Sequence, residues 1–372
     1  MILEPLIKNN SKTVNEAVLS LKDSRSVYLK NIAGSYLSFF SNDLIDQLKG
    51  YHLFVFPEKE EALYFYNDLE NIIKNERGTT LLFYPASFRR PFQIEQSDPT
   101  SVLQRTEVLN ALSKQRKKVI VVTYSEAMVE KVINKKDFEK SSLTLSIDEE
   151  VGVDILNEWL IEMHFEKVDY VYEPGQFAVR GGIIDIFSFT HEFPYRIELF
   201  GDTIESLREF NPVDQLSIVT HNKIKISPDI NHQEISKNRV SFLQYLPKQT
   251  LVWIKDLEIA QSKIDSGFVK AKEVYEKIEG KEGLLPAEMY IARSDFISHI
   301  NSYQLVEWSS VTKTENNNII DANSSPQPSF NKNFELLVNT LNEWKSKEYK
   351  IHICSDQESQ INRLRTIFAD LE

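Results

Sequence analysis

Tyr195–Phe200 is a predicted β-strand that carries side chains suited to protein recognition. Successive side chains on a strand point to opposite faces, so one face holds Tyr195, Ile197 and Leu199, and the other holds Arg196, Glu198 and Phe200. The first set is the natural core face, which leaves an arginine and a phenylalanine together on the outside. Arginine and aromatic residues are enriched at binding hot spots. The alternative is a solvent-exposed Arg196–Glu198 pair of little energetic worth, with Phe200 as a core residue at the hairpin end.

A second arginine lies in the preceding run of β-type sequence, where Phe177 and Val179 alternate with Ala178 and Arg180. Arg180 joins the same patch if a turn or bulge at Gly181-Gly182 rotates it outward.

Catalytic and metal-binding patterns are absent from the sequence. No G-x-S-x-G or G-x-G-x-x-G occurs, and the single cysteine, Cys354, cannot build a thiolate zinc site. The seven histidines, at positions 52, 164, 191, 221, 232, 299 and 352, show no ligand spacing. The acid pairs Glu60-Glu61 and Glu149-Glu150 are expected on solvated surface. The basic run Lys114–Lys118 is expected to compensate a helix dipole rather than to contact DNA.

The first third of the chain alternates strand and helix signals. His52–Phe56, Thr79–Tyr84 and Val119–Tyr124 are continuous apolar runs. Amphipathic segments separate them, and one of these begins at a cap-like Asp98-Pro99 pair. Continuous apolar strands between such helices predict a parallel sheet that is covered on both faces.

The pattern changes near Leu143, where a helix-forming segment precedes dense β signals. Pro174-Gly175 and Gly201-Asp202 are predicted turns. We therefore expect residues 1–142 to form the first part of an α/β domain, and residues 143–227 to form a small α+β insert. Residues 228–318 would return to the α/β domain, with a strand near Thr250–Ile254.

Residues 319–372 are expected to form a linker and an incomplete further domain. Asn316–Phe330 is polar and contains prolines. A helix, a strand at Tyr349–Cys354 and a last helix follow it. One helix–strand–helix unit cannot bury both faces of its strand, so we expect the chain to end inside a small α/β domain.

Composition limits the class of protein. With 43 Lys and Arg against 55 Asp and Glu, the formal charge is -12, which disfavours non-specific DNA binding by the whole chain. The lone cysteine suits a reducing compartment. Neither a leader pattern nor a long apolar stretch that could span a bilayer is present. A cytoplasmic protein without a membrane contact is expected.

Three segments carry a resemblance to known families. Glu173–Ser217 closely resembles a segment shared by UvrB and the bacterial transcription-repair coupling factors (Mfd), and Asp98–Lys114 resembles a helix of the same proteins. Ser329–Leu364 is similar to the start of the next small domain in the coupling factors only. The resemblance implies a RecA/helicase-like domain interrupted by an insert like the second domain of UvrB. It also implies that Arg180, Arg196 and Phe200 contact UvrA.

The nucleotide site of UvrB has a degenerate counterpart in this chain. A phosphate-binding loop needs glycines, a lysine and a Ser/Thr hydroxyl at a strand-to-helix turn. The resembling turn keeps Gly34 and Ser35, but it has Tyr36 at the second glycine, Leu37 at the lysine and Ser38 at the hydroxyl. Tight nucleotide binding is therefore not expected, and this segment is expected to be no enzyme and to need no cofactor. The aromatic hairpin with which UvrB clamps DNA also has no match.

The resemblance implies a UvrA-recruiting module of a coupling factor. In that family a motor, expected beyond residue 372, hydrolyses ATP with Mg²⁺, moves on duplex DNA and displaces stalled RNA polymerase. Two alternatives stay open: a fragment of a divergent UvrB or helicase ATPase, and a purely autoinhibitory structural module.

Overall fold

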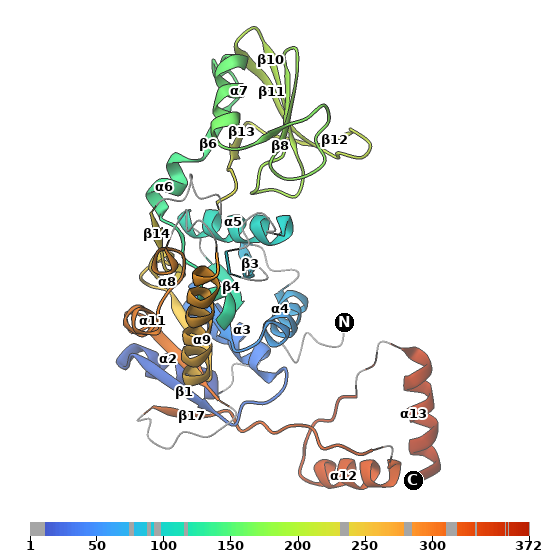
Figure 1. The fold of residues 1–372 in the computed structure, drawn as a ribbon. Coiled ribbons are helices and arrows are strands. Elements are labelled where there is room, and N and C mark those ends of the chain that lie inside the picture. Colours follow the sequence, from blue (N-terminus) through green and yellow to red (C-terminus); the bar gives the residue numbers. More distant parts are fainter. Residues whose placement is uncertain are drawn as a thin grey trace. The chain divides into compact units, whose positions relative to one another are not determined.

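The computed structural model describes residues 12–73, 78–87, 91–92, 98–114, 118–230, 238–278, 285–309, 318–331, 333–353, 355 and 357–371. The chain divides into two units, Met1–Ser324 and Ser325–Glu372. The larger unit contains a parallel sheet and a separate, mostly antiparallel sheet, and the described part of the smaller unit contains two helices (Figure 1).

A seven-stranded sheet, in which every neighbouring pair is parallel, forms the first layer of the larger unit. Its order is β17-β1-β16-β15-β2-β4-β3. The strands are β1 (Ser26–Lys30), β2 (Gly50–Phe56), β3 (Thr79–Tyr84), β4 (Lys118–Tyr124), β15 (Leu251–Lys255), β16 (Gln304–Trp308) and β17 (Ile319–Asp321). The chain leaves the sheet after β4 and returns with β15 and β16, which fill the space between β2 and β1. The predicted α/β class with an interrupted parallel sheet is confirmed.

Helices cover both faces of this sheet. They are α2 (Lys12–Asp23), α3 (Tyr36–Leu48), α4 (Lys59–Ile73), α5 (Pro99–Ser113), α8 (Phe242–Tyr245), α9 (Leu257–Glu276), α10 (Pro286–Met289) and α11 (Arg293–Ile300). Crossovers between parallel strands are right-handed as a rule, and with this strand order the rule puts α3 and α4 on one face and α5 and α9 on the other. As predicted, Asp98 caps α5, and its carboxylate accepts a hydrogen bond from the Thr100 amide at 3.2 Å.

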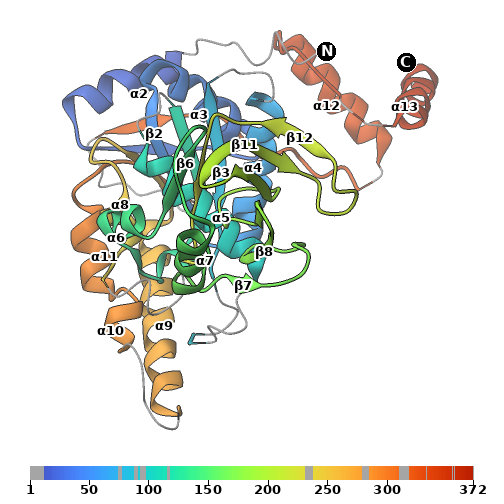
Figure 2. The ribbon, with the colours of Figure 1, turned by 90° about the horizontal axis from the view of Figure 1, so that it is seen from above.

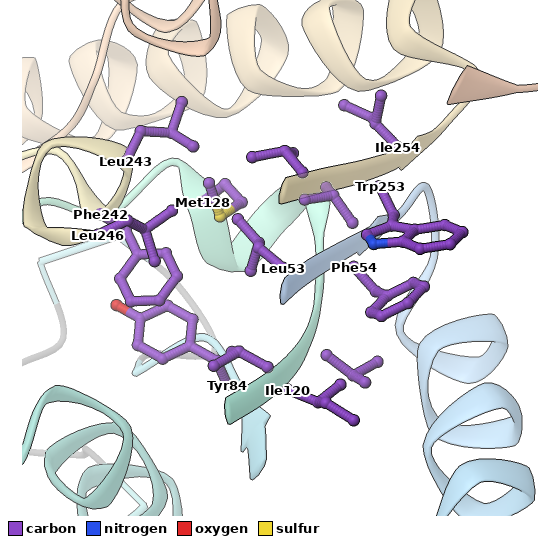
Figure 3. Packing of buried hydrophobic residues seen from close by; sticks show 14 of the residues in the cluster. Leu53, Phe54, Tyr84, Ile120, Met128, Phe242, Leu243, Leu246, Trp253 and Ile254 are labelled. Carbon is purple, nitrogen blue, oxygen red and sulfur yellow. The ribbon is translucent and has the colours of Figure 1, made fainter. Parts of the chain in front are cut away.

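Aromatic side chains pack among aliphatic ones in the core around the sheet (Figure 3). Trp253 of β15 stacks on Phe54 of β2 with ring centroids 4.8 Å apart, and Phe54 contacts Phe65 of α4. Tyr84 of β3 stacks on Phe242 of α8 at 4.0 Å. These contacts join strands from the two parts of the chain on either side of the insert, so both parts share one core.

The insert contains a six-stranded sheet of order β12-β11-β10-β9-β8-β7, packed on one helix, α7 (Val153–Glu162). Its strands are β7 (Glu166–Lys167), β8 (Gln176–Arg180), β9 (Ile183–Ile186), β10 (Tyr195–Phe200), β11 (Thr203–Phe210) and β12 (Ser217–Thr220). A two-stranded pair, β6 (Leu143–Ser146) with β13 (Lys223–Ile226), joins the entering and leaving chain. A further pair, β5 (Val132–Ile133) with β14 (Arg239–Val240), lies beyond it together with α6 (Lys135–Lys140) and the short 3-10 helix η2 (Ser125–Met128).

Two expectations about the carboxy-terminal part need correction. The predicted linker Asn316–Phe330 contributes β17, which pairs with β1 and extends the sheet by one strand. The predicted strand Tyr349–Cys354 is not formed by its described residues, 349–353, and no described strand of the smaller unit is available to pair with it. The smaller unit therefore consists of α12 (Phe334–Ser346) and α13 (Glu358–Leu371) with the chain around them. The expected domain limits at 142, 227 and 318 remain predictions.

Candidate functional site

The insert sheet has a buried inner face, and its outer face carries several charged side chains beside a small apolar cluster. Tyr195 and Ile197 of β10 are buried, in a core that includes Leu156 and Leu160 of α7. The outward residues of β10 are those predicted from strand alternation: Arg196 and Glu198 are half-buried and Phe200 is exposed. A bulge between Glu198 and Leu199 does not change this assignment, because Leu199 still packs against the inner core.

Asp185 of β9 joins the two predicted arginines on the outer face. Its carboxylate is buried and lies directly across from Arg196 in the register of the sheet. Arg196 donates from Nε to Oδ1 at 2.7 Å and from Nη2 to Oδ2 at 2.8 Å, and Arg180 donates to Oδ2 as well. Burial of an unpaired carboxylate costs free energy, so Asp185 requires the two guanidinium groups as partners. Their charge-assisted hydrogen bonds to Asp185 in turn fix the positions of both arginines.

Neighbouring side chains fix Arg196 further. Its guanidinium lies 4.3 Å from the centre of the buried Phe210 ring, and its Nη2 donates to Gln215 Oε1 at 2.8 Å. The Arg196 side chain is 17% exposed, and the hydrogen bonds that it donates to Asp185 raise its pKa above the ordinary value. The group is therefore charged and ordered, with one edge reachable from outside.

Arg180 is held more loosely at the end of β8. Its Nη1 donates to the Asp169 carbonyl at 3.0 Å, its guanidinium lies over the Tyr170 ring, and its side chain is 36% exposed. Gly181 and Gly182 form the two-residue turn that follows, with Gly181 at φ 62°. A Cβ on Gly182 would lie 2.7 Å from the Leu199 carbonyl oxygen, so glycine is required where this turn approaches β10.

Phe200 ends β10 just before the predicted Gly201-Asp202 turn, and its side chain is 81% exposed. The alternative of a core phenylalanine at the hairpin end is therefore wrong. The alternative Arg196–Glu198 pair is also wrong, because Glu198 pairs with Arg208 while Arg196 pairs with Asp185. Arg180, Arg196 and Phe200 thus lie on one face, as strand alternation predicted for Arg196 and Phe200. Arg180 joins them by the same alternation along β8, without a rotation at Gly181-Gly182. Both arginines are paired with Asp185 and are not free in solvent.

Asp185, Gln215 and Phe210 were missed by the reasoning from sequence. A usable signal existed for Asp185, because aspartate is depleted in strands and this one interrupts the apolar run Ile183–Phe187. Gln215 reaches Arg196 because the loop after β11 folds back, which no local pattern indicated. The contact of Phe210 with Arg196 depends on the register between β10 and β11.

The turn that resembles a phosphate-binding loop, residues 34–38, lies at the carboxyl ends of β1, β2, β15 and β16, beside a cavity of about 440 Å³. Gly34 at φ 57° and Ser35 precede α3 and line this cavity with Leu37 and Ser38. Crevices at this edge of an open parallel sheet are the usual ligand sites of such folds. Tyr36 is half-buried against Phe40, and Leu37 is buried in the core.

The charges in this cavity are unfavourable for a polyphosphate. The ammonium group of Lys255 lies 2.7 Å from the Glu61 carboxylate, and the Ser38 hydroxyl donates to Asp68 at 3.3 Å. A phosphate bound here would meet two carboxylates and a cation that is already paired. Glu61 was expected on solvated surface, whereas it lines the cavity and pairs with Lys255.

The remaining sequence expectations concern metals, membranes and basic runs. Across the described ranges, no three His, Cys, Asp or Glu side chains are grouped as metal ligands, and no helix is both long and apolar enough to cross a membrane. Cys354 and residues 115–117 of the basic run lie outside the described residues. Lys118 does not compensate the dipole of α5, because it begins β4 and pairs with Asp46 of α3.

Comparisons with known proteins match the insert to a family and most of the chain to several relatives. Residues 143–232 match the UvrB interaction domain family. The transcription-repair-coupling factor of Bacillus subtilis is 28% identical over 255 residues, which cover 68% of this chain and 20% of that protein. A stretch of 76 residues, 20% of this chain and 6% of the relative, is 46% identical to the transcription-repair-coupling factor of Mycobacterium tuberculosis.

UvrABC system protein B of Thermosipho africanus is 23% identical over 240 residues, covering 61% of this chain and 36% of that protein. The chain spans about a fifth of the length of the coupling factors of Bacillus subtilis and Borreliella burgdorferi. The resemblance to the UvrB-like part of the coupling factors is confirmed.

Proposed function

We propose that this chain, a relative of the transcription-repair coupling factors with a UvrB interaction domain at residues 143–232, recruits UvrA through the outer face of that domain. The observation that carries the proposal is the ordered group of Arg180, Asp185 and Arg196 on the same face as the exposed Phe200. We call the three binding residues Arg180, Arg196 and Phe200 the recognition face.

The chemistry of the recognition face supports a protein partner. Each guanidinium is already positioned by Asp185, so binding need not order a free arginine side chain. An exposed phenylalanine supplies apolar contact area that water solvates poorly, and arginine–aromatic groups of this kind dominate the energy of many interfaces. Because Asp185 neutralises only one of the two arginines, the partner is expected to present a carboxylate.

For the longer protein, the function follows the coupling factors. A motor in the remainder of such a protein would use ATP and Mg²⁺ to move on duplex DNA and displace stalled RNA polymerase, while the present module brings in UvrA. The module itself would not hydrolyse ATP, because Leu37 takes the lysine position and Glu61 and Asp68 line the cavity. Measurable ATP turnover by this chain would instead favour the alternative of a divergent UvrB or helicase ATPase.

The test is a binding titration of UvrA against the wild-type chain and Arg196→Glu. The exchange replaces a positioned cation by a carboxylate beside Asp185, so affinity should fall by about thirtyfold or more. Arg293→Glu is the matched control, because Arg293 is exposed on α11, outside the insert. The affinity of this variant for UvrA should equal that of the wild type. Equal affinities for the two variants would refute the recognition face. No binding by the wild type would leave the purely autoinhibitory role.

A further inference from the structure

The loop between β11 and β12, residues 211–216, is ordered by hydrogen bonds within itself. Asn211 Oδ1 accepts from the Val213 amide and Asp214 Oδ1 accepts from the Leu216 amide, each at 2.9 Å. The loop is closed by the Asn211 amide, which donates to the Leu216 carbonyl at 2.9 Å, and by the Gln215 amide, which donates to the Asn211 carbonyl at 2.8 Å. The loop therefore has a defined shape before any partner binds.

This loop turns its apolar side chains outward. Val213 is 85% exposed and Leu216 is 67% exposed. The polar side chains of Asn211 and Asp214, by contrast, accept hydrogen bonds from amides within the loop. Ile218, which follows on β12, is exposed as well. Contiguous apolar groups on an ordered surface are a feature of interaction sites, because water solvates them poorly and a partner can cover them.

The apolar loop is continuous with the recognition face through one side chain. Gln215 accepts a hydrogen bond from Arg196 at 2.8 Å and donates one from Nε2 to the Pro212 carbonyl at 2.8 Å. Its backbone has φ 62°, which directs the side chain back toward β10 while its neighbours face solvent. The Phe210 ring, under the Arg196 guanidinium, is buried beneath this arrangement. β11 lies between β10 and β12 in the sheet. Figure 2 shows β11 and β12 side by side.

We infer that Val213 and Leu216 form a second, apolar half of the surface that binds the same partner as the recognition face. This inference rests on the proposed function and extends it. The partner would place a carboxylate against the reachable edge of Arg196, and beside that carboxylate an apolar depression would accept Val213 and Leu216. Gln215 is then a positioning residue, because it holds both the loop and the guanidinium in one geometry.

The experiment compares UvrA affinities of the full chain and of the double variant Val213→Ser/Leu216→Ser. Both side chains are exposed, so the thermal unfolding midpoint should stay unchanged while affinity falls by about tenfold or more. The matched control is Ile155→Ser/Ile161→Ser, because those residues are exposed on α7, which covers the opposite face of the same sheet. The control should bind like the wild type.

The outcomes separate this inference from the proposed function. If Phe200→Ala weakens binding but Val213→Ser/Leu216→Ser stays within about twofold of the wild type, the apolar half is refuted and the recognition face stands. Equal losses in the loop variant and the α7 control would also refute it, since the effect would not depend on the face. If the wild-type chain does not bind UvrA, both proposals fall together.

Discussion

At Asp185, a carboxylate with almost no access to solvent faces the guanidinium groups of Arg180 and Arg196. The energetic balance of such a group is asymmetric. The complete cluster contributes modestly to stability, because desolvation of the charges offsets most of their attraction. Loss of one member is costly, because the remaining charges stay partly buried without their partner. The arrangement is therefore better suited to fixing geometry than to stabilising the fold.

Replacement of Asp185 by asparagine tests this asymmetry. We expect Asp185→Asn to lower the free energy of unfolding by about 3 kcal/mol, since two arginines lose the charge that they share. Affinity for UvrA should fall as well, because neither guanidinium is held in position. Urea unfolding and a UvrA titration measure the two effects.

Glu198→Gln is the matched control for that substitution. The Glu198–Arg208 pair lies on the same face but is about one-third exposed on each side, so its loss should cost less than about 1 kcal/mol. Equal destabilisation by the two variants would show that Asp185 has no special role.

At the scale of elements, the sequence predicted what depends on local pattern. Thr79–Tyr84 matches β3 at both ends, and alternation along β10 assigned the faces of all its residues correctly. β17 was missed because it has three residues and pairs only with β1, far away in the chain. The strand at Tyr349–Cys354 was predicted from apolar residues alone, and strands require a neighbour to accept their hydrogen bonds.

The turn between β8 and β9 gives an element-scale prediction. Gly182→Ala would place a Cβ 2.7 Å from the Leu199 carbonyl oxygen, so β10 must shift at its bulge. We expect a loss of stability of about 1–3 kcal/mol, typical of forced overpacking, and a weaker affinity for UvrA. Gly152→Ala is the control, since its nearest neighbour would be a side-chain atom at an ordinary 3.7 Å. Thermal unfolding compares the stability of the two variants. A Gly182→Ala variant as stable as the wild type would contradict the close approach of Gly182 to β10.

The pairing of β2 with β15 gives a pH prediction. His52 is buried, accepts from Trp253 Nε1 through Nδ1 at 3.2 Å, and lies 2.9 Å from the Lys49 carbonyl through Nε2. Burial lowers its pKa from 6.5 to about 4. The unfolded chain therefore takes up this proton first, so the free energy of unfolding should fall as pH decreases from about 6.5 toward 4.

His52→Gln, which does not titrate, should show a smaller decrease over the same pH range. Burial also lowers the pKa of His191 to about 4. His191 therefore contributes part of the pH dependence in both the wild type and the variant. Parallel pH profiles for the wild type and the variant, measured by urea unfolding, would contradict this account of His52.

At the scale of the whole molecule, the two units differ in how much they bury. In the larger unit, the core of the parallel sheet and the core of the insert are both extensive. In the smaller unit, α12 buries none of its residues. Helices of this length depend on packing for stability, so α12 and α13 should be marginal in the chain as it stands.

Hydrogen exchange measures this difference directly. Amides of α12 and α13 should exchange rapidly, whereas those of β2, β4 and β15 should exchange only through extensive unfolding. Deletion of residues 325–372 should leave the unfolding midpoint of the remainder and its affinity for UvrA unchanged. Slow exchange of the α12 amides would contradict this account, because it would require the helix to be stabilised by packing that the structure does not show.

The central claim is that UvrA binds the outer face of the insert, and the affinity of Phe200→Ala tests it most directly. Because Phe200 is exposed at a hairpin end, its truncation should leave the fold intact and reduce affinity for UvrA by about thirtyfold. Tyr64→Ala removes an equally accessible aromatic ring from α4 and should bind UvrA like the wild type. If Phe200→Ala binds as tightly as Tyr64→Ala, the recognition face is not where UvrA binds.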